Sequence, residues 1–108
     1  LLRLPRGGRL AVGNIELFGV HAEHTEDSIG LIVRGHGQTV YFTADTLWSD
    51  LLITDARPFS PNVLVTCING RWGNMDHRQG SRAEGPFVHS HALRHVCRKH
   101  GGSRRFRP

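Results

Sequence analysis

Short apolar runs separated by glycine-containing turns fill the first two thirds of the chain. Arg9 to Val20 alternates loosely between apolar and polar residues across Gly13-Asn14, a pair that favours a hairpin turn. Ile29 to Val33 is a compact apolar run, and Thr39 to Thr43 is its expected antiparallel partner across Gly35-His36-Gly37. The pattern predicts a sheet that is assembled from hairpins.

The next stretch predicts one short helix and one buried strand. Leu47 to Ala56 favours a helix with Ser49 or Asp50 as its N-cap, and the prolines that follow end it. Asn62 to Ile68 is an apolar run without a charge, which predicts a strand that is buried on both faces.

The pattern changes after Met75. Asp76 with Gln79 three residues later is typical of a capping box, yet glycines and a proline interrupt any helical period that follows. The sequence therefore predicts a helix start without a helix. We divide the chain here into a domain over residues 1–79 and an off-pattern basic tail over residues 80–108, which we expect to be disordered.

Charge follows the same division. Residues 1–76 hold six Arg and eight Asp plus Glu, a net of −2, and residues 77–108 hold eight Arg plus Lys and one Glu, a net of +7. Because only the tail is basic, we do not expect nucleic acid to be the partner of the whole chain. Two cysteines form no disulfide framework, and no run approaches the roughly 20 apolar residues of a membrane helix. We expect a cytoplasmic protein without a membrane partner.

Two predicted strand ends carry side chains that can bind a metal ion. His24 follows the strand that includes Val20, and Asp45 follows the strand that ends near Thr43. A histidine and a carboxylate on neighbouring strand-end loops are suited to a cation site. Each also has a simpler interpretation: His24 as a surface histidine in a polar loop, and Asp45 as a turn residue that accepts hydrogen bonds from backbone amides.

The loop after the apolar strand carries side chains suited to an anionic substrate. Asn69, Arg71 and Asn74 can all donate hydrogen bonds, Arg71 through its planar guanidinium. The alternative for these three residues is ordinary loop chemistry without a ligand.

Three segments in this order resemble the metallo-β-lactamase superfamily: HTEDSIG at 24–30, YFTADT at 41–46 and VLVTCINGRWGNM at 63–75. Within it they are most similar to the L-ascorbate-6-phosphate lactonase-like (UlaG-like) branch, over about residues 9 to 79. The resemblance implies an α/β fold, here a partial αββα sandwich of mostly β-strands with one or two short helices.

The resemblance also implies a function. His24 would bind one metal and Asp45 would bridge two divalent ions, Zn²⁺ or Mn²⁺. The implied reaction is hydrolysis of a lactone or ester by a metal-bound hydroxide, whose pKa the cation lowers toward neutrality. The implied substrate is small and anionic, such as a sugar-phosphate lactone.

Three departures from the family pattern change what we expect of this chain. The His-x-His-x-Asp-His segment that provides most ligands and the acid–base aspartate is absent, so we assign no catalytic residue. Ala44 stands where the family has a glycine that lets the backbone pass close to the metals. The Pro-x-His-Tyr segment that carries a last histidine ligand is also absent. These departures predict a fragment with two of the ligands and no activity alone, whose half-sandwich exposes an apolar face and favours aggregation.

A shifted reading frame accounts for the tail. Codons for residues 80–108 can be chosen so that the same nucleotides, read one base later, encode a helix followed by a Pro-Met-His-Tyr segment. We therefore expect the tail to be a frameshift product. The alternatives are a non-enzymatic remnant and a small basic nucleic-acid-binding module, and tail histidines could also bind metal.

Overall fold

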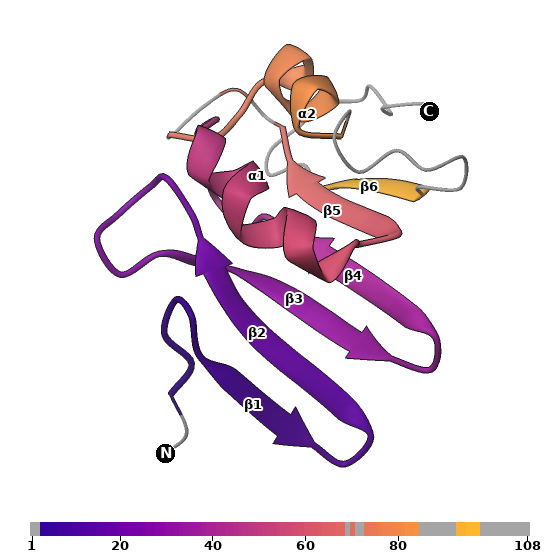
Figure 1. Cartoon of the computed structure of the whole chain (residues 1–108). Coiled ribbons are helices and arrows are strands. Elements are labelled where there is room, and N and C mark those ends of the chain that lie inside the picture. The colour runs from indigo at the N-terminus through magenta and orange to yellow at the C-terminus, as the bar shows by residue number, and fades with distance from the viewer. Residues whose placement is uncertain (1–2, 69, 71–72, 85–92, 98–108) are drawn as a thin grey trace.

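A six-stranded sheet forms the centre of the structure, a computed structural model that describes residues 3–68, 70, 73–84 and 93–97. The strands follow one another across the sheet in chain order, and the helices pack beside them (Figure 1). The elements are β1 (Arg9–Val12), β2 (Ile15–His21), β3 (Ile29–Gly35), β4 (Gln38–Phe42), α1 (Asp50–Ala56), the 3-10 helix η1 (Arg57–Phe59), β5 (Val63–Cys67), α2 (His77–Glu84) and β6 (Leu93–Cys97).

Hairpins join the first strands, as the pattern predicted. β1 and β2 pair antiparallel across a turn in which Gly13 has a φ of 59°. β3 and β4 pair antiparallel across His36 and Gly37, whose φ angles are 52° and 74°. Two consecutive residues with positive φ give the turn a twist that matches the right-handed twist of the strands.

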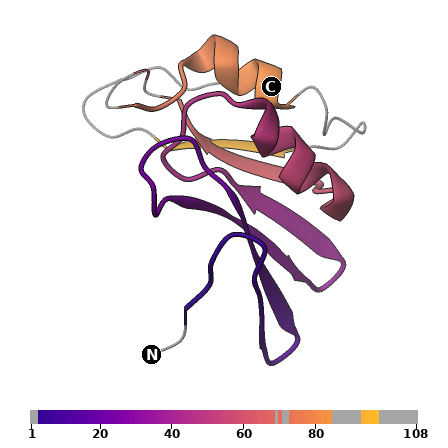
Figure 2. The ribbon, with the colours of Figure 1, turned by 60° about the vertical axis from the view of Figure 1, so that its left-hand side comes forward.

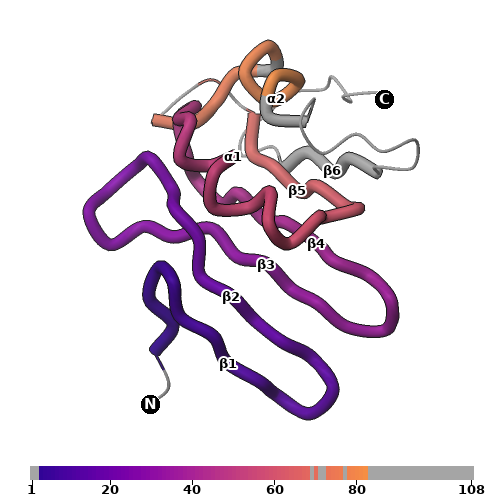
Figure 3. The backbone as a smooth tube through the Cα atoms, in the orientation of Figure 1, coloured from indigo at the N-terminus to yellow at the C-terminus, as the bar shows by residue number. Residues whose placement is uncertain are grey.

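Strands β2, β4, β5 and β6 all run in the same direction. β4, β5 and β6 pair parallel, while β2 and β4 each pair antiparallel with β3. The loops that follow β2, β4 and β5 therefore leave the sheet at the same edge, which we call the carboxyl edge (Figure 3).

The main core lies on one face of the sheet, beneath α1 (Figure 2). Ala56 of α1 packs with side chains from β2 to β5 that are 2% exposed or less: Val20, Ile32, Tyr41 and Leu64. The predicted helix is confirmed as α1, although it begins at Asp50. The Ser49 side chain caps it and accepts a hydrogen bond from the Leu51 amide at 3.2 Å.

The opposite face is less well covered than the sequence predicted. In β5, Leu64 and Thr66 are buried on the α1 side, whereas Val63 and Val65 are only half-buried. The expectation that this strand is buried on both faces therefore holds at Cys67, which is 6% exposed on the second side, and fails at Val63 and Val65. The reason is that no described helix packs on the side that carries Val63 and Val65.

Helix α2 corrects the expectation that no helix follows Asp76. The capping box forms: the Asp76 amide donates to Gln79 Oε1 at 3.1 Å, and the Gln79 amide donates to Asp76 Oδ1 at 2.9 Å. Gly80 lets the helix approach β5, because a Cβ there would lie 2.5 Å from Cγ2 of Ile68. Capping and close approach sustain this helix where an apolar stripe is missing.

The predicted tail is described only in part. Residues 80–84 belong to α2, and residues 93–97 form β6, which pairs parallel with β5. The other tail residues lie outside the described residues, so the division after Gln79 and the frameshift stay predictions. Among the described residues, no helix has the length and apolar character needed to cross a membrane.

Candidate metal centre

Hydrogen bonds join three loops at the carboxyl edge: residues 22–28, residues 43–49 and the described residues that follow β5 (68, 70 and 73–76). The Leu47 amide donates to the Glu23 carbonyl at 2.8 Å, and the Met75 amide donates to the Thr46 carbonyl at 2.8 Å. Oγ1 of Thr46, a residue with no exposed surface, accepts from the Glu23 amide at 2.7 Å. The loop after β4 is therefore fixed between the loops after β2 and β5.

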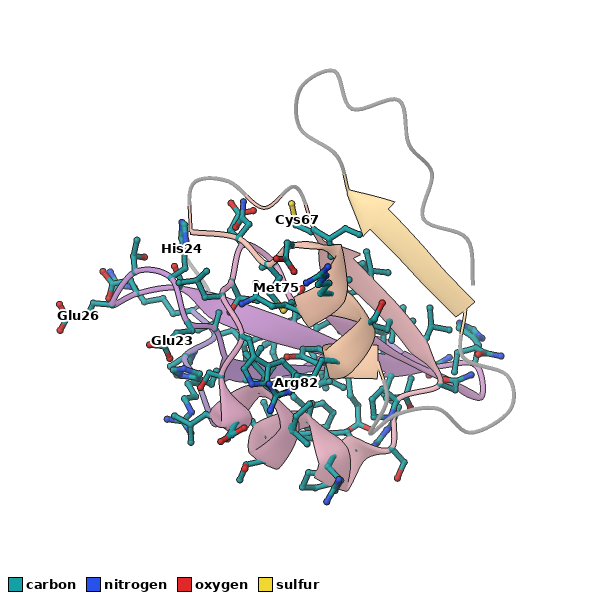
Figure 4. The ribbon with its side chains drawn as sticks, turned by 90° about the horizontal axis from the view of Figure 1, so that it is seen from above. Glu23, His24, Glu26, Cys67, Met75 and Arg82 are labelled. Carbon is teal, nitrogen blue, oxygen red and sulfur yellow. The ribbon has the colours of Figure 1, made fainter. Side chains whose placement is uncertain are left out.

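His24 lies on the first of these loops and faces the third. Its Nδ1 is 3.4 Å from the Gly73 carbonyl oxygen, and a Cβ at Gly73 would lie 2.9 Å from the same nitrogen. Gly73 also has a φ of 76°, so this close approach requires glycine. Figure 4 shows His24 on the side of its loop toward Met75, while Glu26 points away from the molecule. In the tautomer with the proton on Nδ1, Nε2 keeps the lone pair that binds a cation.

Asp45 lies on the middle loop and is half-buried. Within the described part of the chain, its carboxylate takes part in no hydrogen bond or ion pair, so it does not accept from turn amides. The simpler interpretation of Asp45 as a turn residue thus has no support here. A half-buried carboxylate without a partner is available to a ligand.

Ala44 adopts a left-handed conformation directly before Asp45, with a φ of 58°. This conformation is rare for residues with a Cβ and routine for glycine. The structure therefore adds a conformational reason for the glycine that the resemblance places here. In this chain an alanine adopts the left-handed conformation that glycine would adopt more easily.

Asn74 lies on the third loop and is 6% exposed. Its Oδ1 is buried and accepts no hydrogen bond within the described residues. A buried amide oxygen without a donor costs about 1–3 kcal/mol. Asn74 therefore holds an unused acceptor beside Gly73, whose carbonyl contacts His24. Asn69 and Arg71 lie outside the described residues, so their predicted contacts with substrate stay predictions.

A carboxylate that sequence reasoning missed holds the end of β2. Oδ2 of Asp55 accepts from the His21 amide at 2.8 Å and from Arg6 Nε at 2.7 Å. The hydrogen bond from Arg6 holds the pKa of Asp55 below its usual range, and the bond from the His21 amide acts in the same direction. Asp55 therefore fixes the strand end from which the His24 loop departs. No motif marks it, because its partners are distant in the sequence.

A cavity of about 590 Å³ lies beside the first loop, lined by residues 4–6 and 21–29. His24 is among its lining residues and Asp45 is not. His21 Nε2 and Glu23 Oε2, 2.6 Å apart, form a pair in its wall. The cavity thus opens on one of the two predicted ligands only.

The described residues do not complete a metal site. No three His, Cys, Asp or Glu side chains within this part of the chain come together as ligands. Hydrogen bonds between residues adjacent to His24 and Asp45 hold their two loops at one edge of the sheet. These two side chains would provide only two of the four ligands that a zinc site usually has. That they bind the same ion stays a prediction.

Solved structures share this fold. No protein-family profile matches the sequence, and no curated protein matches it either. The metallo-β-lactamase fold protein YhfI from Bacillus subtilis superposes with a TM-score of 0.69 at 18% identity, over 88% of this chain and 42% of that one. Igni18, a metallo hydrolase from the archaeon Ignicoccus hospitalis, gives 0.65 at 21% identity, over 80% of this chain and 40% of that one. An isothiocyanate hydrolase from Delia radicum gut bacteria superposes with a TM-score of 0.65 at 16% identity, over 87% of this chain and 43% of that one.

These likenesses confirm the predicted fold class: the chain has part of the metallo-β-lactamase fold. It spans less than half the length of each of these three structures. The likeness is one of fold and leaves the lactonase-like branch a prediction.

Proposed function

We propose that this chain is part of a metal-dependent hydrolase, and that His24 and Asp45 bind the same divalent cation. The observation that carries the proposal is the half-buried, unpartnered carboxylate of Asp45 on a loop bonded to the His24 loop. The contact between His24 Nδ1 and the Gly73 carbonyl supports it, because such a contact orients a metal-binding imidazole.

The chemistry that we propose is hydrolysis of a lactone or ester. A bound Zn²⁺ or Mn²⁺ would supply the Lewis acidity that activates water and polarises a carbonyl. His24 presents Nε2 from a ring held on its other side, and Asp45 adds a negative charge. We propose that Asn69, Arg71 and Asn74 bind a small anionic substrate such as a sugar-phosphate lactone. We also propose that the protein acts in the cytoplasm.

The chain alone should not turn over such a substrate. Two ligands leave the proposed site incomplete, and this chain covers only 40% and 42% of two solved structures of this fold. We propose that a complete enzyme supplies the remaining ligands from a segment that this sequence does not hold. A lactone-hydrolysis assay of the purified chain with Zn²⁺ or Mn²⁺ should show no rate above the uncatalysed one.

Zinc titration of ¹⁵N-labelled protein tests the shared site. We expect the His24 ring nitrogens and the Asp45 amide to shift together with a single binding curve. Asp45→Asn should weaken the zinc response of His24 by about tenfold or more, because it removes the charged ligand. His36→Ala is the matched control, since His36 is also an exposed histidine but lies in the β3–β4 turn, and the response of His24 should stay unchanged.

An unchanged His24 response in Asp45→Asn would contradict the shared site. That result would favour a non-enzymatic remnant whose histidines bind zinc independently. Tail histidines are present in every variant, so their contribution does not alter the comparison.

A further inference from the structure

The loop after β2 and the loop after β4 meet at an irregular contact. Glu23 and Leu47 form an isolated antiparallel bridge, in which the Leu47 amide donates directly to the Glu23 carbonyl at 2.8 Å. In a regular antiparallel pair of this kind, the two residues exchange both amide-to-carbonyl hydrogen bonds. Here the return bond takes a different path. The Glu23 amide donates to Oγ1 of Thr46 at 2.7 Å, and the same hydroxyl donates to the Leu47 carbonyl at 2.8 Å.

The hydroxyl of Thr46 is therefore inserted between two backbones and sets the distance between them. Two hydrogen bonds in series span a longer distance than one amide-to-carbonyl bond of about 2.9 Å. On the other side of the bridge, the direct bond from the Leu47 amide to the Glu23 carbonyl keeps the two loops from moving further apart. The hydroxyl thus acts as a spacer of defined length.

This spacer is enclosed by protein. Thr46 has no exposed surface, so its hydroxyl does not exchange its partners for bulk water. Its one proton and one of its lone pairs are used in the bonds to Leu47 and Glu23. The backbone carbonyl of Thr46 also accepts from the Met75 amide at 2.8 Å, which joins the same residue to the loop after β5. All of these contacts are made within this chain.

The spacer lies next to both proposed metal ligands in the sequence. Glu23 directly precedes His24, and Thr46 directly follows Asp45. A change in the distance between Glu23 and Thr46 therefore reaches each ligand across a single peptide unit. The His24 ring does not compensate freely, because its Nδ1 is held 3.4 Å from the Gly73 carbonyl oxygen.

We propose that Thr46 is a positioning residue of the metal centre, and that its hydroxyl sets the separation between His24 and Asp45. This inference rests on the proposed function, in which both side chains bind one cation. A cation binds its ligands within about 0.2 Å of a preferred distance, so the separation of two donors decides whether both can bind together. Groups that hold a ligand in place without touching the metal typically change its affinity by about 10- to 100-fold.

The simpler role for this hydroxyl is to satisfy a buried amide. Any buried amide that loses its partner destabilises the fold, so a loss of stability alone would not identify a spacer. Thr66 on β5 provides a comparison, since it is 4% exposed and its Oγ1 accepts from Thr43 Oγ1 at 2.8 Å. That bond involves no residue of the loop after β2. The two buried threonines therefore separate spacing from stability.

Zinc titration of the ¹⁵N-labelled full chain compares three substitutions. Thr46→Val removes the hydroxyl at nearly constant volume and should weaken the shared zinc response of His24 and Asp45 by about 10- to 100-fold. Thr46→Ser keeps a hydroxyl and should restore the wild-type response. Thr66→Val is the matched control, because it removes the hydroxyl of another buried threonine and should leave the zinc response unchanged.

NOEs between backbone protons of Glu23 and Leu47 report the separation of the two loops in the zinc-free chain. We expect their intensities to change in Thr46→Val and to stay at the wild-type level in Thr46→Ser and Thr66→Val. Circular dichroism shows whether each variant is folded. Should Thr46→Val fail to fold, Thr46→Ala provides the same test, because it removes the hydroxyl without placing a methyl group against the Glu23 amide.

A folded Thr46→Val variant with wild-type NOEs or wild-type zinc binding would overturn the proposal. An equal loss of zinc response in Thr66→Val would also overturn it, since stability rather than spacing would then be the cause. Independent zinc responses of His24 and Asp45 in the wild type would overturn the proposed function instead. The zinc-free NOEs alone would then decide whether the hydroxyl sets the separation of the two loops.

Discussion

Replacing Ala44 with glycine should stabilise the chain. Ala44 has a φ of 58°, and a left-handed conformation costs a residue with a Cβ about 1–2 kcal/mol. Glycine removes this cost, but its more flexible unfolded state makes folding less favourable by about 0.5–1 kcal/mol. Because Ala44 is exposed, the lost methyl group opens no cavity. We expect a net gain of about 0.5–1 kcal/mol in the free energy of unfolding.

Urea unfolding followed by circular dichroism measures this gain as a higher midpoint at an unchanged slope. Ala11→Gly is the matched control, since Ala11 is also exposed but lies in β1 with an ordinary φ. That substitution should lower the free energy of unfolding by about 0.5–1 kcal/mol. If Ala44→Gly destabilised the chain as much as Ala11→Gly does, the conformation assigned to Ala44 would be wrong.

Three further predictions concern the segments that position the loops. Asp55→Asn should destabilise the chain at neutral pH by about 1 kcal/mol, by weakening the hydrogen bonds that the carboxylate accepts. Because the pKa of Asp55 is lower in the folded chain than its unfolded value near 3.9, the ionised carboxylate stabilises the fold above that value, and this stabilisation is lost as pH falls through the folded pKa. The urea midpoints of the wild type and Asp55→Asn should therefore converge at acidic pH. A difference that stays constant with pH would contradict the role assigned to Asp55. Gly19→Ala should destabilise by about 1–3 kcal/mol because its Cβ meets the Pro5 carbonyl, whereas an unchanged urea midpoint would show that Pro5 does not pack there. Asp76→Ala should cost about 1 kcal/mol and speed amide hydrogen exchange in α2, and equal exchange in both proteins would exclude the capping box.

Much of the sheet could be predicted from local pattern. Turn residues such as Gly13 and Gly37 mark where strands reverse, and Ser49 marks the start of α1. These features depend on residues close in the sequence, which the alternation of apolar and polar positions records. The fold class followed from motifs in the right order and is confirmed by the solved structures.

The errors involve contacts between distant residues. Gly80 disfavours a helix when it is judged from the sequence, yet it permits the close approach of α2 to Ile68. Asp55 lies within a helix pattern, and nothing near it in the sequence reveals that it accepts from the His21 amide. The apolar run in β5 could not show which side of the strand would be covered, because that depends on where helices pack.

The candidate site could be predicted only as separate motifs. The apolar runs before them predicted that His24 and Asp45 lie at strand ends. The structure adds the hydrogen bonds to Thr46 that hold their loops together. It also adds the contact of His24 with Gly73 and the unsatisfied oxygen of Asn74. Whether the two predicted ligands share an ion depends on binding itself.

Paramagnetic broadening by Mn²⁺ tests that central claim most directly. In ¹H–¹⁵N spectra recorded at substoichiometric Mn²⁺, amides of the His24 and Asp45 loops should lose intensity together, ahead of those in the β3–β4 turn. Asp45→Asn should reduce the broadening of both loops. Broadening around His24 that leaves the Asp45 loop sharp, or that persists unchanged in Asp45→Asn, would contradict a shared cation.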